Sequence, residues 1–352
     1  MNRLWNDLEG IRRLTEGLWE EMRGERIFIT GGTGFFGAWL LESFCHVNRE
    51  LGLEAEATVL SRDPAKFAEK CPDVANDRAV TLLQGDVRDF GFPAGEFRYI
   101  IHAATEASAR QAAEAPLEML STILAGTERT LEFAKRCGAR KFLLTGSGAV
   151  YGKQPADLTH VPESYAGAPD PLDAASVYAE GKRASELMCA LHEKHAREKG
   201  VEFEAKIARC WAFCGPHLPL HAHFAIGNFI GDALAGRPIR IGGDGTPRRS
   251  YLYASDLAVW LWTMLFRAPS LTPVNVGSGN DVSIRELAEM VAAKLASGTE
   301  VQVAKQAVAG APVARYVPCV KRAEELLGLR ETVELVDQIR RTAEWHRANG
   351  NA

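Results

Sequence analysis

The sequence predicts an α/β protein with a doubly wound parallel sheet and a smaller, mixed α/β domain at its carboxyl end. Up to about residue 210, short apolar runs typical of buried strands alternate with segments of helical spacing. A glycine-rich turn follows the first strand, and later strands end in small or hydroxyl residues. This alternation is typical of parallel sheets that bind ligands at the carboxyl ends of their strands.

The first strand and the turn after it predict a dinucleotide site. An apolar run at 27–29 is followed by Gly31, Gly34 and Gly37, and helical spacing resumes at 40–44. Glycines three apart let the backbone turn sharply, approach a ligand and pack the helix on the strand. The helix begins with unpaired N–H groups, so we expect it to bind a pyrophosphate, as in a Rossmann-type domain.

Length and composition are those of an ordinary globular protein of 352 residues, with 46% hydrophobic and 24% charged residues. Apolar positions spaced as in a helix predict one helix from Leu4 to Met22. We expect an N-terminal helical extension at 1–23, a dinucleotide-binding domain at 24–210 and a mainly substrate-binding domain at 211–352, between which sheet strands can interleave.

The net charge, the apolar runs and the cysteines indicate which kinds of partner the protein is not expected to bind. The formal charge of −4 gives no field that would gather nucleic acid. The first residues carry charges throughout and no apolar run reaches the length of a membrane span, so we expect a cytoplasmic enzyme without a membrane partner. Cys210 and Cys214 have no accompanying ligand pair, so we predict buried, reduced thiols and no metal site.

The end of the second expected strand, at 57–61, bears on the choice of cofactor. In a dinucleotide fold this position meets the adenosine ribose, where an acidic residue binds the 2′-hydroxyl and an arginine favours a 2′-phosphate. Ser61 and Arg62 stand there, which slightly favours NADP over NAD. Two alternatives remain open: Asp63 turns inward and selects NAD, or Arg62 is only a solvated turn residue.

A hydroxyl, a phenol and an ammonium group form the predicted catalytic set. The strand at 141–147 ends at Ser147, and Tyr178 and Lys182 lie four residues apart on a later helix, hence on one face. A neighbouring ammonium group favours a tyrosine phenolate, which can act as acid or base on an alcohol. We therefore predict that Tyr178 and Lys182 act with Ser147. His102, inside a short apolar strand, is better interpreted as a packed histidine than as a base.

The carboxyl third contains candidate substrate contacts. The segment 241–251 is interpreted as a hairpin-like turn followed by Arg248 and Arg249. An arginine fork suits a phosphate, which favours a diphosphate-bearing substrate, although the two arginines could also be a solvated pair. In the loop at 216–227, three histidines could line a pocket or face solvent: His217, His221 and His223.

Taken together, the motifs resemble the extended short-chain dehydrogenase/reductase family, specifically its nucleotide-sugar epimerases, dehydratases, decarboxylases and reductases. The resemblance runs from about Arg26 to Trp345. It rests on the glycine turn, Gly85–Asp86–Val87, His102–Ala103–Ala104, Ser147 before Val150–Tyr151–Gly152, Tyr178 with Lys182, Gly215–Pro216, Arg249 before Tyr253 and Asp256, and Asn275–Val276–Gly277.

The resemblance implies roles for individual residues. Catalysis would use Ser147, Tyr178 and Lys182, with the tyrosine phenolate taking the proton of a sugar hydroxyl while hydride passes to the nicotinamide. The implied cofactor contacts are Gly31, Gly34, Phe35, Phe36, Gly37, Ser61, Arg62, Asp86, Val87, Ala103, Ala104, Tyr178 and Lys182. The implied substrate contacts are Thr105, Ser147, Asn228 and Arg249, the last two at the diphosphate. A homodimer is also implied, with helices near 119–137 and 178–199 at its interface.

Departures from the family pattern bear on the reaction. The 4,6-dehydratases have an Asp-Glu pair after the hydroxyl residue, where this chain has Gly148 and Ala149. The residues from Tyr178 to Arg183, together with Asn228–Phe229–Ile230, are most similar to UDP-glucuronate decarboxylases, which also have a Glu at the place of Ala149. Asparagines usual in the family are replaced by Ile123 and Ala212.

The leading prediction is an enzyme that transfers hydride at C4 of a nucleoside-diphosphate sugar, either an epimerase or a 4-keto reductase. The alternatives are a UDP-glucuronate decarboxylase-like or 4,6-dehydratase-like enzyme and, more remotely, a non-catalytic NAD(P)-binding sensor. Such a sensor would be expected to have lost Tyr178 or Lys182, and both are present.

Overall fold

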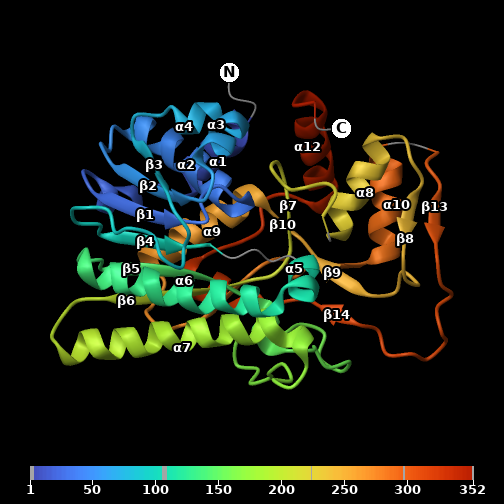
Figure 1. Cartoon of the computed structure of the whole chain (residues 1–352). Coiled ribbons are helices and arrows are strands. Elements are labelled where there is room, and N and C mark those ends of the chain that lie inside the picture. The colour runs from blue at the N-terminus through green and yellow to red at the C-terminus, as the bar shows by residue number, and fades with distance from the viewer. Residues whose placement is uncertain (1–3, 105–108, 223, 296–297, 351–352) are drawn as a thin grey trace.

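The computed structural model describes residues 4–104, 109–222, 224–295 and 298–350. Its centre is a seven-stranded sheet in which every neighbouring pair is parallel (Figure 1). The order across the sheet is β11 (Val274–Val276), β6 (Glu204–Cys210), β5 (Lys141–Ser147), β4 (Tyr99–His102), β1 (Arg26–Thr30), β2 (Glu56–Ser61) and β3 (Val80–Gln84). The predicted doubly wound parallel sheet is confirmed.

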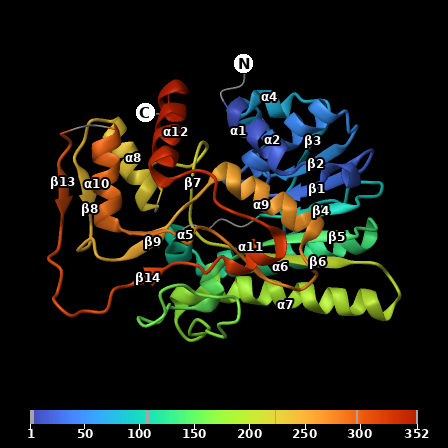
Figure 2. The same cartoon turned by 180° about the vertical axis from the view of Figure 1, so that it is seen from behind.

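Helices cover both faces of this sheet. One face carries α6 (Pro116–Arg136) and α7 (Val177–Glu198), which lie side by side in Figures 1 and 2. The other carries α2 (Phe35–Leu51) and α9 (Ala254–Arg267). Because side chains alternate along a strand, Ile27 and Ile29 enter one core while Phe28 enters the other. The shorter helices are α3 (Pro64–Lys70), α4 (Pro72–Ala75), α5 (Ala109–Glu114) and α11 (Lys321–Leu327).

The remaining elements form a separate lobe beside the carboxyl edge of the sheet. Its helices are α8 (Ala225–Leu234), α10 (Ile284–Leu295) and α12 (Leu335–Ala348). Its strands form a pair, β8 (Ile239–Ile241) with β13 (Val301–Val303), and a trio of β12 (Asp281–Ser283), β9 (Arg248–Ser250) and β14 (Arg315–Tyr316). Two further short strands, β7 (Phe213–Cys214) and β10 (Leu252–Tyr253), pair with each other. Both β11 and α9 come from beyond residue 211, but β11 joins the central sheet and α9 packs on one of its faces.

The expected hairpin at 241–251 is wrong. Strand β8 pairs with β13, whereas β9 pairs with β12 and β14, so the turn carries the chain from one small sheet to another. Asp244 accepts hydrogen bonds from the Thr246 N–H and hydroxyl, and Gly245 has a positive φ of 81°. Arg248 then bonds Asp281 of β12, which adds a side-chain contact to the β9–β12 pair.

The expected helix from Leu4 to Met22 is divided in two. Helix α1 (Trp5–Leu14) ends before a turn in which Gly17 has a φ of +78°, and a 3-10 helix, η1 (Trp19–Met22), follows. Leu8 and Ile11 are buried where α1 packs on α2 and α9. The extension therefore covers the core of its own chain.

Candidate active site

The glycine turn has the geometry that a dinucleotide site needs. Gly31 has a φ of +71°, and a Cβ there would lie 2.5 Å from the backbone carbonyl of Ala103. A Cβ on Gly37 would lie 2.2 Å from the Gly32 backbone, so both glycines serve the packing of the turn. Gly34 is exposed, and its Cβ would meet nothing closer than 3.5 Å. Space is therefore left at the amino end of α2, where free N–H groups would suit a pyrophosphate.

Other residues predicted to contact the cofactor lie near the glycine turn, at the carboxyl ends of the strands. Phe35 and Phe36 open α2 and are partly buried, with their ring centroids 5.9 Å apart. Ala103 and Ala104 follow β4, and the Ala104 N–H donates to the Thr30 hydroxyl at 3.2 Å. Small side chains here leave the carboxyl edge open for a cofactor.

More charged side chains lie beyond the ends of β2 and β3, where the adenosine ribose was expected, than the sequence analysis named. Asp63 accepts a 3.0 Å bond from the Lys66 N–H and caps α3, so its carboxylate serves the helix. Arg88 binds both oxygens of Asp86, at 2.8 and 3.0 Å, and this bonding lowers the pKa of that carboxyl. The charge of Arg62 acts in the same direction. Arg88 was missed by the sequence reasoning, although it follows Asp86 by only two residues.

His102 is buried within a network of hydroxyl groups. Its Nδ1 lies 2.8 Å from the Thr30 Oγ1, and its Nε2 lies 3.2 Å from the Thr127 Oγ1. Burial lowers the pKa of His102 to about 3, so the ring is neutral. A neutral, enclosed imidazole agrees with the interpretation as a packed histidine. Val87, nearby, is buried against Gly126 of α6.

Ser147, Tyr178 and Lys182 come together at the carboxyl edge. Ser147 is the last residue of β5, Tyr178 lies on the first turn of α7, and the Ser147 hydroxyl acts to lower the pKa of the Tyr178 phenol. Lys182 is buried, with its Nζ 5.9 Å from the centre of the Tyr178 ring. The same Nζ donates to the Thr145 carbonyl at 2.8 Å. The arrangement can hold an alcohol between two hydroxyl groups beside a cation.

Burial has the largest effect on the pKa values of Tyr178 and Lys182. It raises the pKa of Tyr178 to about 12, against the opposing effect of the Ser147 hydroxyl. It lowers the pKa of Lys182 to about 8. The expected lowering of the tyrosine pKa by the ammonium group is not seen, because burial raises this pKa and Lys182 is not among the groups that shift it.

The space beside Gly148 is filled by two aromatic residues from distant parts of the chain. A Cβ on Gly148 would lie 2.5 Å from the Trp211 ring and 2.9 Å from the Tyr316 hydroxyl oxygen. The Trp211 N–H and the Tyr151 hydroxyl both donate to the Asn275 side-chain oxygen, at 3.2 and 3.0 Å. No local sequence pattern pointed to Trp211 or Tyr316.

Ile123 and Ala212, which stand where the family usually has asparagines, both have packing roles in the structure. Ile123 is buried where α6 packs on α7, and a Cβ on Gly181 would lie 2.9 Å from its Cδ1. Its side chain therefore supports the helix that carries Tyr178 and Lys182. Ala212 accepts a 3.0 Å backbone bond from Leu252 and joins the core of the smaller lobe.

The expected substrate contacts lie in two places. Asn228, on α8, lines a hollow of about 280 Å³ together with Arg240 and the turn at 242–245. Arg249 lies elsewhere, with its guanidinium 5.9 Å from the Tyr316 ring centre. The expected arginine fork is not formed, because Arg248 bonds Asp281 and Glu286. Within the described residues no carboxylate pairs with Arg249. Among the remaining candidates, His217 is buried, His221 is exposed, and Thr105 and His223 lie outside the described residues.

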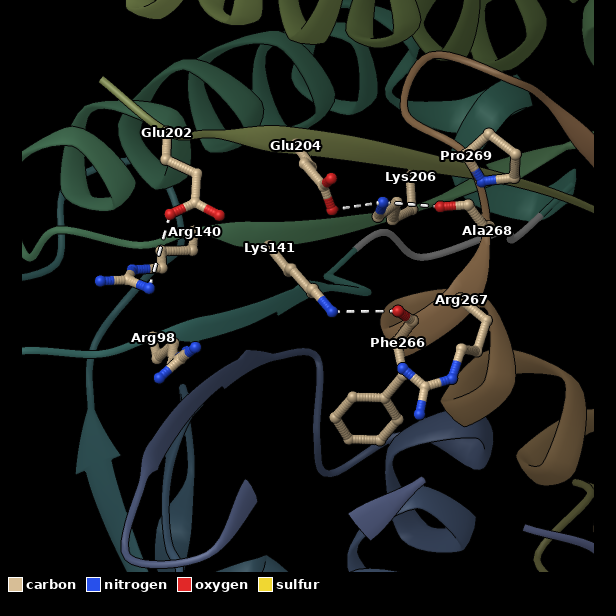
Figure 3. A pocket seen from close by; sticks show the side chains of 10 residues that line it. All are labelled: Arg98, Arg140, Lys141, Glu202, Glu204, Lys206, Phe266, Arg267, Ala268 and Pro269. Atoms are coloured by element: carbon tan, nitrogen blue, oxygen red, sulfur yellow. Dashed lines mark hydrogen bonds and ion pairs between the residues drawn. The ribbon is translucent and has the colours of Figure 1, made fainter. Parts of the chain in front are cut away.

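A second hollow, of about 360 Å³, lies at the opposite edge of the sheet (Figure 3). Lys141 and Lys206 donate to the carbonyls of Phe266 and Ala268 at the end of α9, at 3.0 and 2.6 Å. Both lysines and the arginines around them are paired with glutamates. These cations neutralise the negative end of a helix and belong to the framework.

A family model described as "NAD dependent epimerase/dehydratase family" matches residues 27–277, from the first strand of the sheet through its last. The chain belongs to this family. It is therefore an enzyme that uses a nicotinamide cofactor, as predicted. Within the described residues, no helix is long and apolar enough to cross a membrane.

Named relatives agree with this assignment. UDP-glucuronic acid decarboxylase 1 of Xenopus tropicalis is 30% identical over 324 residues, which cover 92% of this chain and 72% of the relative. UDP-glucuronic acid decarboxylase 6 of Arabidopsis thaliana is 31% identical over 88% of this chain and 85% of the relative. A UDP-glucose 4-epimerase from Thermotoga maritima shares the fold, with a TM-score of 0.76 at 21% identity over 92% of this chain and 99% of that one.

Proposed function

We propose that this enzyme transfers hydride at C4 of a nucleoside-diphosphate sugar, either as an epimerase that retains its cofactor or as a 4-keto reductase. The observation that carries the proposal is the meeting of Ser147, Tyr178 and Lys182 at the sheet edge that also bears the glycine turn. Neither a sensor nor a scaffold would need a phenol, a hydroxyl and a buried cation gathered at this edge of the sheet.

The roles follow from the contacts. Ser147 and Tyr178 would hold the sugar hydroxyl between them, and Tyr178 would take its proton. Lys182, anchored on the Thr145 carbonyl, would place its charge near the developing phenolate. A nicotinamide cofactor, held by the glycine turn and the amino end of α2, would supply the hydride acceptor or donor.

The finer choice of cofactor belongs to the same proposal. Arg62, directly after β2, and the use of an Asp63 oxygen as a helix cap support NADP over NAD. A 2′-phosphate would find the positive charge of Arg62 there, whereas Arg88 is paired with Asp86 and one Asp63 oxygen is used in the cap of α3.

The nucleotide end of the substrate would lie over the smaller lobe. The hollow lined by Asn228, Arg240 and the turn at 242–245 has room for a base or ribose, and Arg249 would bind a phosphate. A homodimer would form through α6 and α7, which lie at the outer surface in Figures 1 and 2. Leu187 and Leu191 of α7 are more than half exposed, which supports this interface.

Decarboxylation of a UDP-glucuronate-like sugar is the second candidate, favoured by the decarboxylase relatives. It too begins with oxidation at C4, so the same residues would serve. Ala149 stands where those enzymes have a Glu, and Gly148 has no room for a side chain, so the later steps would need other groups.

The test begins with the nucleotide released from the denatured protein, identified by mass spectrometry. The purified enzyme is then incubated with UDP-glucose, UDP-galactose or UDP-glucuronate, or with a 4-keto sugar nucleotide and NADPH, and products are followed by NMR. Interconversion of C4 isomers indicates an epimerase, NADPH consumption a reductase, and carbon dioxide release a decarboxylase.

Tyr178→Phe should abolish turnover and leave dinucleotide affinity within about threefold, while Tyr165→Phe, a nearby tyrosine outside the set, should keep both. We expect at least a hundredfold loss of kcat in the first variant, the lower end of what general acid-base catalysis contributes, about 10²- to 10⁴-fold. Unchanged turnover in Tyr178→Phe would contradict the proposed function.

A further inference from the structure

Helix α1 reaches the smaller lobe through a carboxylate. One oxygen of Asp7 accepts a 2.8 Å hydrogen bond from the Tyr253 hydroxyl, and the other accepts a 2.6 Å bond from Arg341 of α12. The Asp7 side chain is only 10% exposed, and Tyr253 is fully buried. One residue near the start of the chain thus joins a strand and a helix that lie 246 and 334 positions further along.

Helix α1 is itself fixed on the helices that cover the central sheet. Leu8 and Ile11 are buried where α1 packs on α2 and α9, and the Glu9 Oε2 lies 3.3 Å from the Nε2 of His46 on α2. Figures 1 and 2 show α1 and α12 at the same end of the molecule. Asp7 therefore connects the helical layer behind the glycine turn with the smaller lobe.

Tyr253 ends the segment that carries Arg249. Strands β9 and β10 follow each other with one residue, Tyr251, between them, and α9 begins directly after Tyr253. Arg249 lies in the middle of β9, four residues before Tyr253. The placement of this short segment therefore determines where the Arg249 guanidinium can lie.

Asp7, α12 and this segment form a closed set of contacts. The Arg341 guanidinium, held by Asp7, lies 5.5 Å from the centre of the Tyr253 ring. Gln338, three residues earlier on α12, donates to the Tyr251 carbonyl oxygen at 3.1 Å. The segment is thus held by α12 at Tyr251 and by Asp7 at Tyr253, while Asp7 also holds α12. Removal of the carboxylate would take the acceptor from a buried hydroxyl and weaken both attachments.

We propose that Asp7 is a positioning residue for substrate binding, which acts through Tyr253 and α12 to hold Arg249 where a substrate diphosphate would lie. The inference rests on the proposed function, because it takes Arg249 as a phosphate contact. It assigns the N-terminal helix a part in substrate affinity that dinucleotide affinity does not share.

The test compares Asp7→Ala with the unchanged enzyme by calorimetric titration. The probes are UDP, which carries the diphosphate whatever the sugar, and NADPH and NADH. We expect the UDP dissociation constant to rise about two- to thirtyfold, as for other changes that act on a site through intervening residues. The dinucleotide dissociation constants should not change. Glu16→Ala, which removes an exposed carboxylate from the same N-terminal segment, should affect neither ligand.

Two further measurements isolate the route. Arg341→Ala should also weaken UDP binding, and adding it to Asp7→Ala should cost less than the two single losses combined, because the residues act as a pair. Hydrogen exchange followed by mass spectrometry, without any ligand, should be faster at 248–253 and in α12 of Asp7→Ala. Exchange at 141–147, in the middle of the central sheet, should stay the same.

The outcomes separate this inference from the proposed function. Unchanged UDP affinity in Asp7→Ala, when Arg249→Ala binds UDP more weakly, overturns the inference and leaves the proposed function standing. Equal losses for UDP and the dinucleotides also overturn it, because they indicate a general structural role. If Arg249→Ala leaves UDP binding unchanged, or UDP does not bind, the substrate placement in the proposed function fails instead. The exchange at 248–253 then still decides whether Asp7 holds that segment.

Discussion

Lys182 donates a 2.8 Å hydrogen bond from its Nζ to the carbonyl oxygen of Thr145, two residues before Ser147 on β5. This bond ties the helix that carries Tyr178 to the strand that carries Ser147. The buried ammonium group therefore has two effects: it fixes the distance between two elements, and it places a positive charge near the phenol.

Dinucleotide binding should weaken above pH 8. Burial lowers the pKa of Lys182 to about 8, so its positive charge is present below that pH and is lost as the pH rises through it. The dissociation constant, measured by fluorescence between pH 6.5 and 9.5, should therefore increase on the alkaline side. Lys182→Met should bind more weakly and show no such alkaline change. A variant with the same pH dependence as the unchanged enzyme would remove Lys182 from this role.

Gly148→Ala should destabilise the protein. Its Cβ would lie 2.5 Å from the Trp211 ring, and overpacking of this kind costs about 1–3 kcal/mol of unfolding free energy. Urea unfolding measures the loss, and Gly91→Ala is the control, because a Cβ there meets nothing within 4 Å. Trp211→Leu should recover part of the loss when combined with Gly148→Ala. If the losses of unfolding free energy in Gly148→Ala and Trp211→Leu simply add in the double variant, the Trp211 ring is not what the added side chain clashes with.

Replacement of Arg62 should change the preference between the two dinucleotides. If Arg62 meets a 2′-phosphate, Arg62→Ser should weaken NADPH binding about tenfold or more and leave NADH nearly unaffected, since a bond to a charged group contributes about 1.5–3 kcal/mol. Calorimetric titration with both nucleotides gives the ratio. Arg78→Ser removes an exposed arginine elsewhere and controls for net charge. Equal losses for both nucleotides would indicate that Arg62 has no part in selectivity.

The free energy of unfolding should fall in mild acid partly because of His102. Its pKa is about 3 in the folded protein and near 6.5 in the unfolded chain, so the unfolded state binds the extra proton between these values. Stability is therefore complete above about pH 6.5 and decreases as the pH falls toward 3, by up to about 1.4 kcal/mol per unit.

His102→Asn should flatten this dependence, measured by denaturant unfolding at pH 7, 6, 5 and 4. His195→Asn, at an exposed position on α7, gives the effect of the same replacement at the surface. If His102→Asn and the unchanged protein lose stability in parallel, the histidine does not contribute to acid sensitivity.

The sequence by itself determined the features that depend on local spacing. Gly31, Gly34 and Gly37 encode the turn through backbone geometry, and the four-residue interval between Tyr178 and Lys182 places both on one face of a helix. Apolar runs ending in small residues were enough for the parallel sheet, because a fully buried strand has a recognisable pattern. The cofactor class followed from the same short segments.

The tertiary structure decided what depends on residues distant in the chain. The pairing of β14 with β9 brings the Tyr316 hydroxyl to Gly148, and the end of β6 places Trp211 over the same glycine. No local pattern encodes either contact, because strand pairing between distant segments is set by the packing of the whole lobe. Burial likewise reversed the expected shift in the Tyr178 pKa, since desolvation depends on everything that surrounds the phenol.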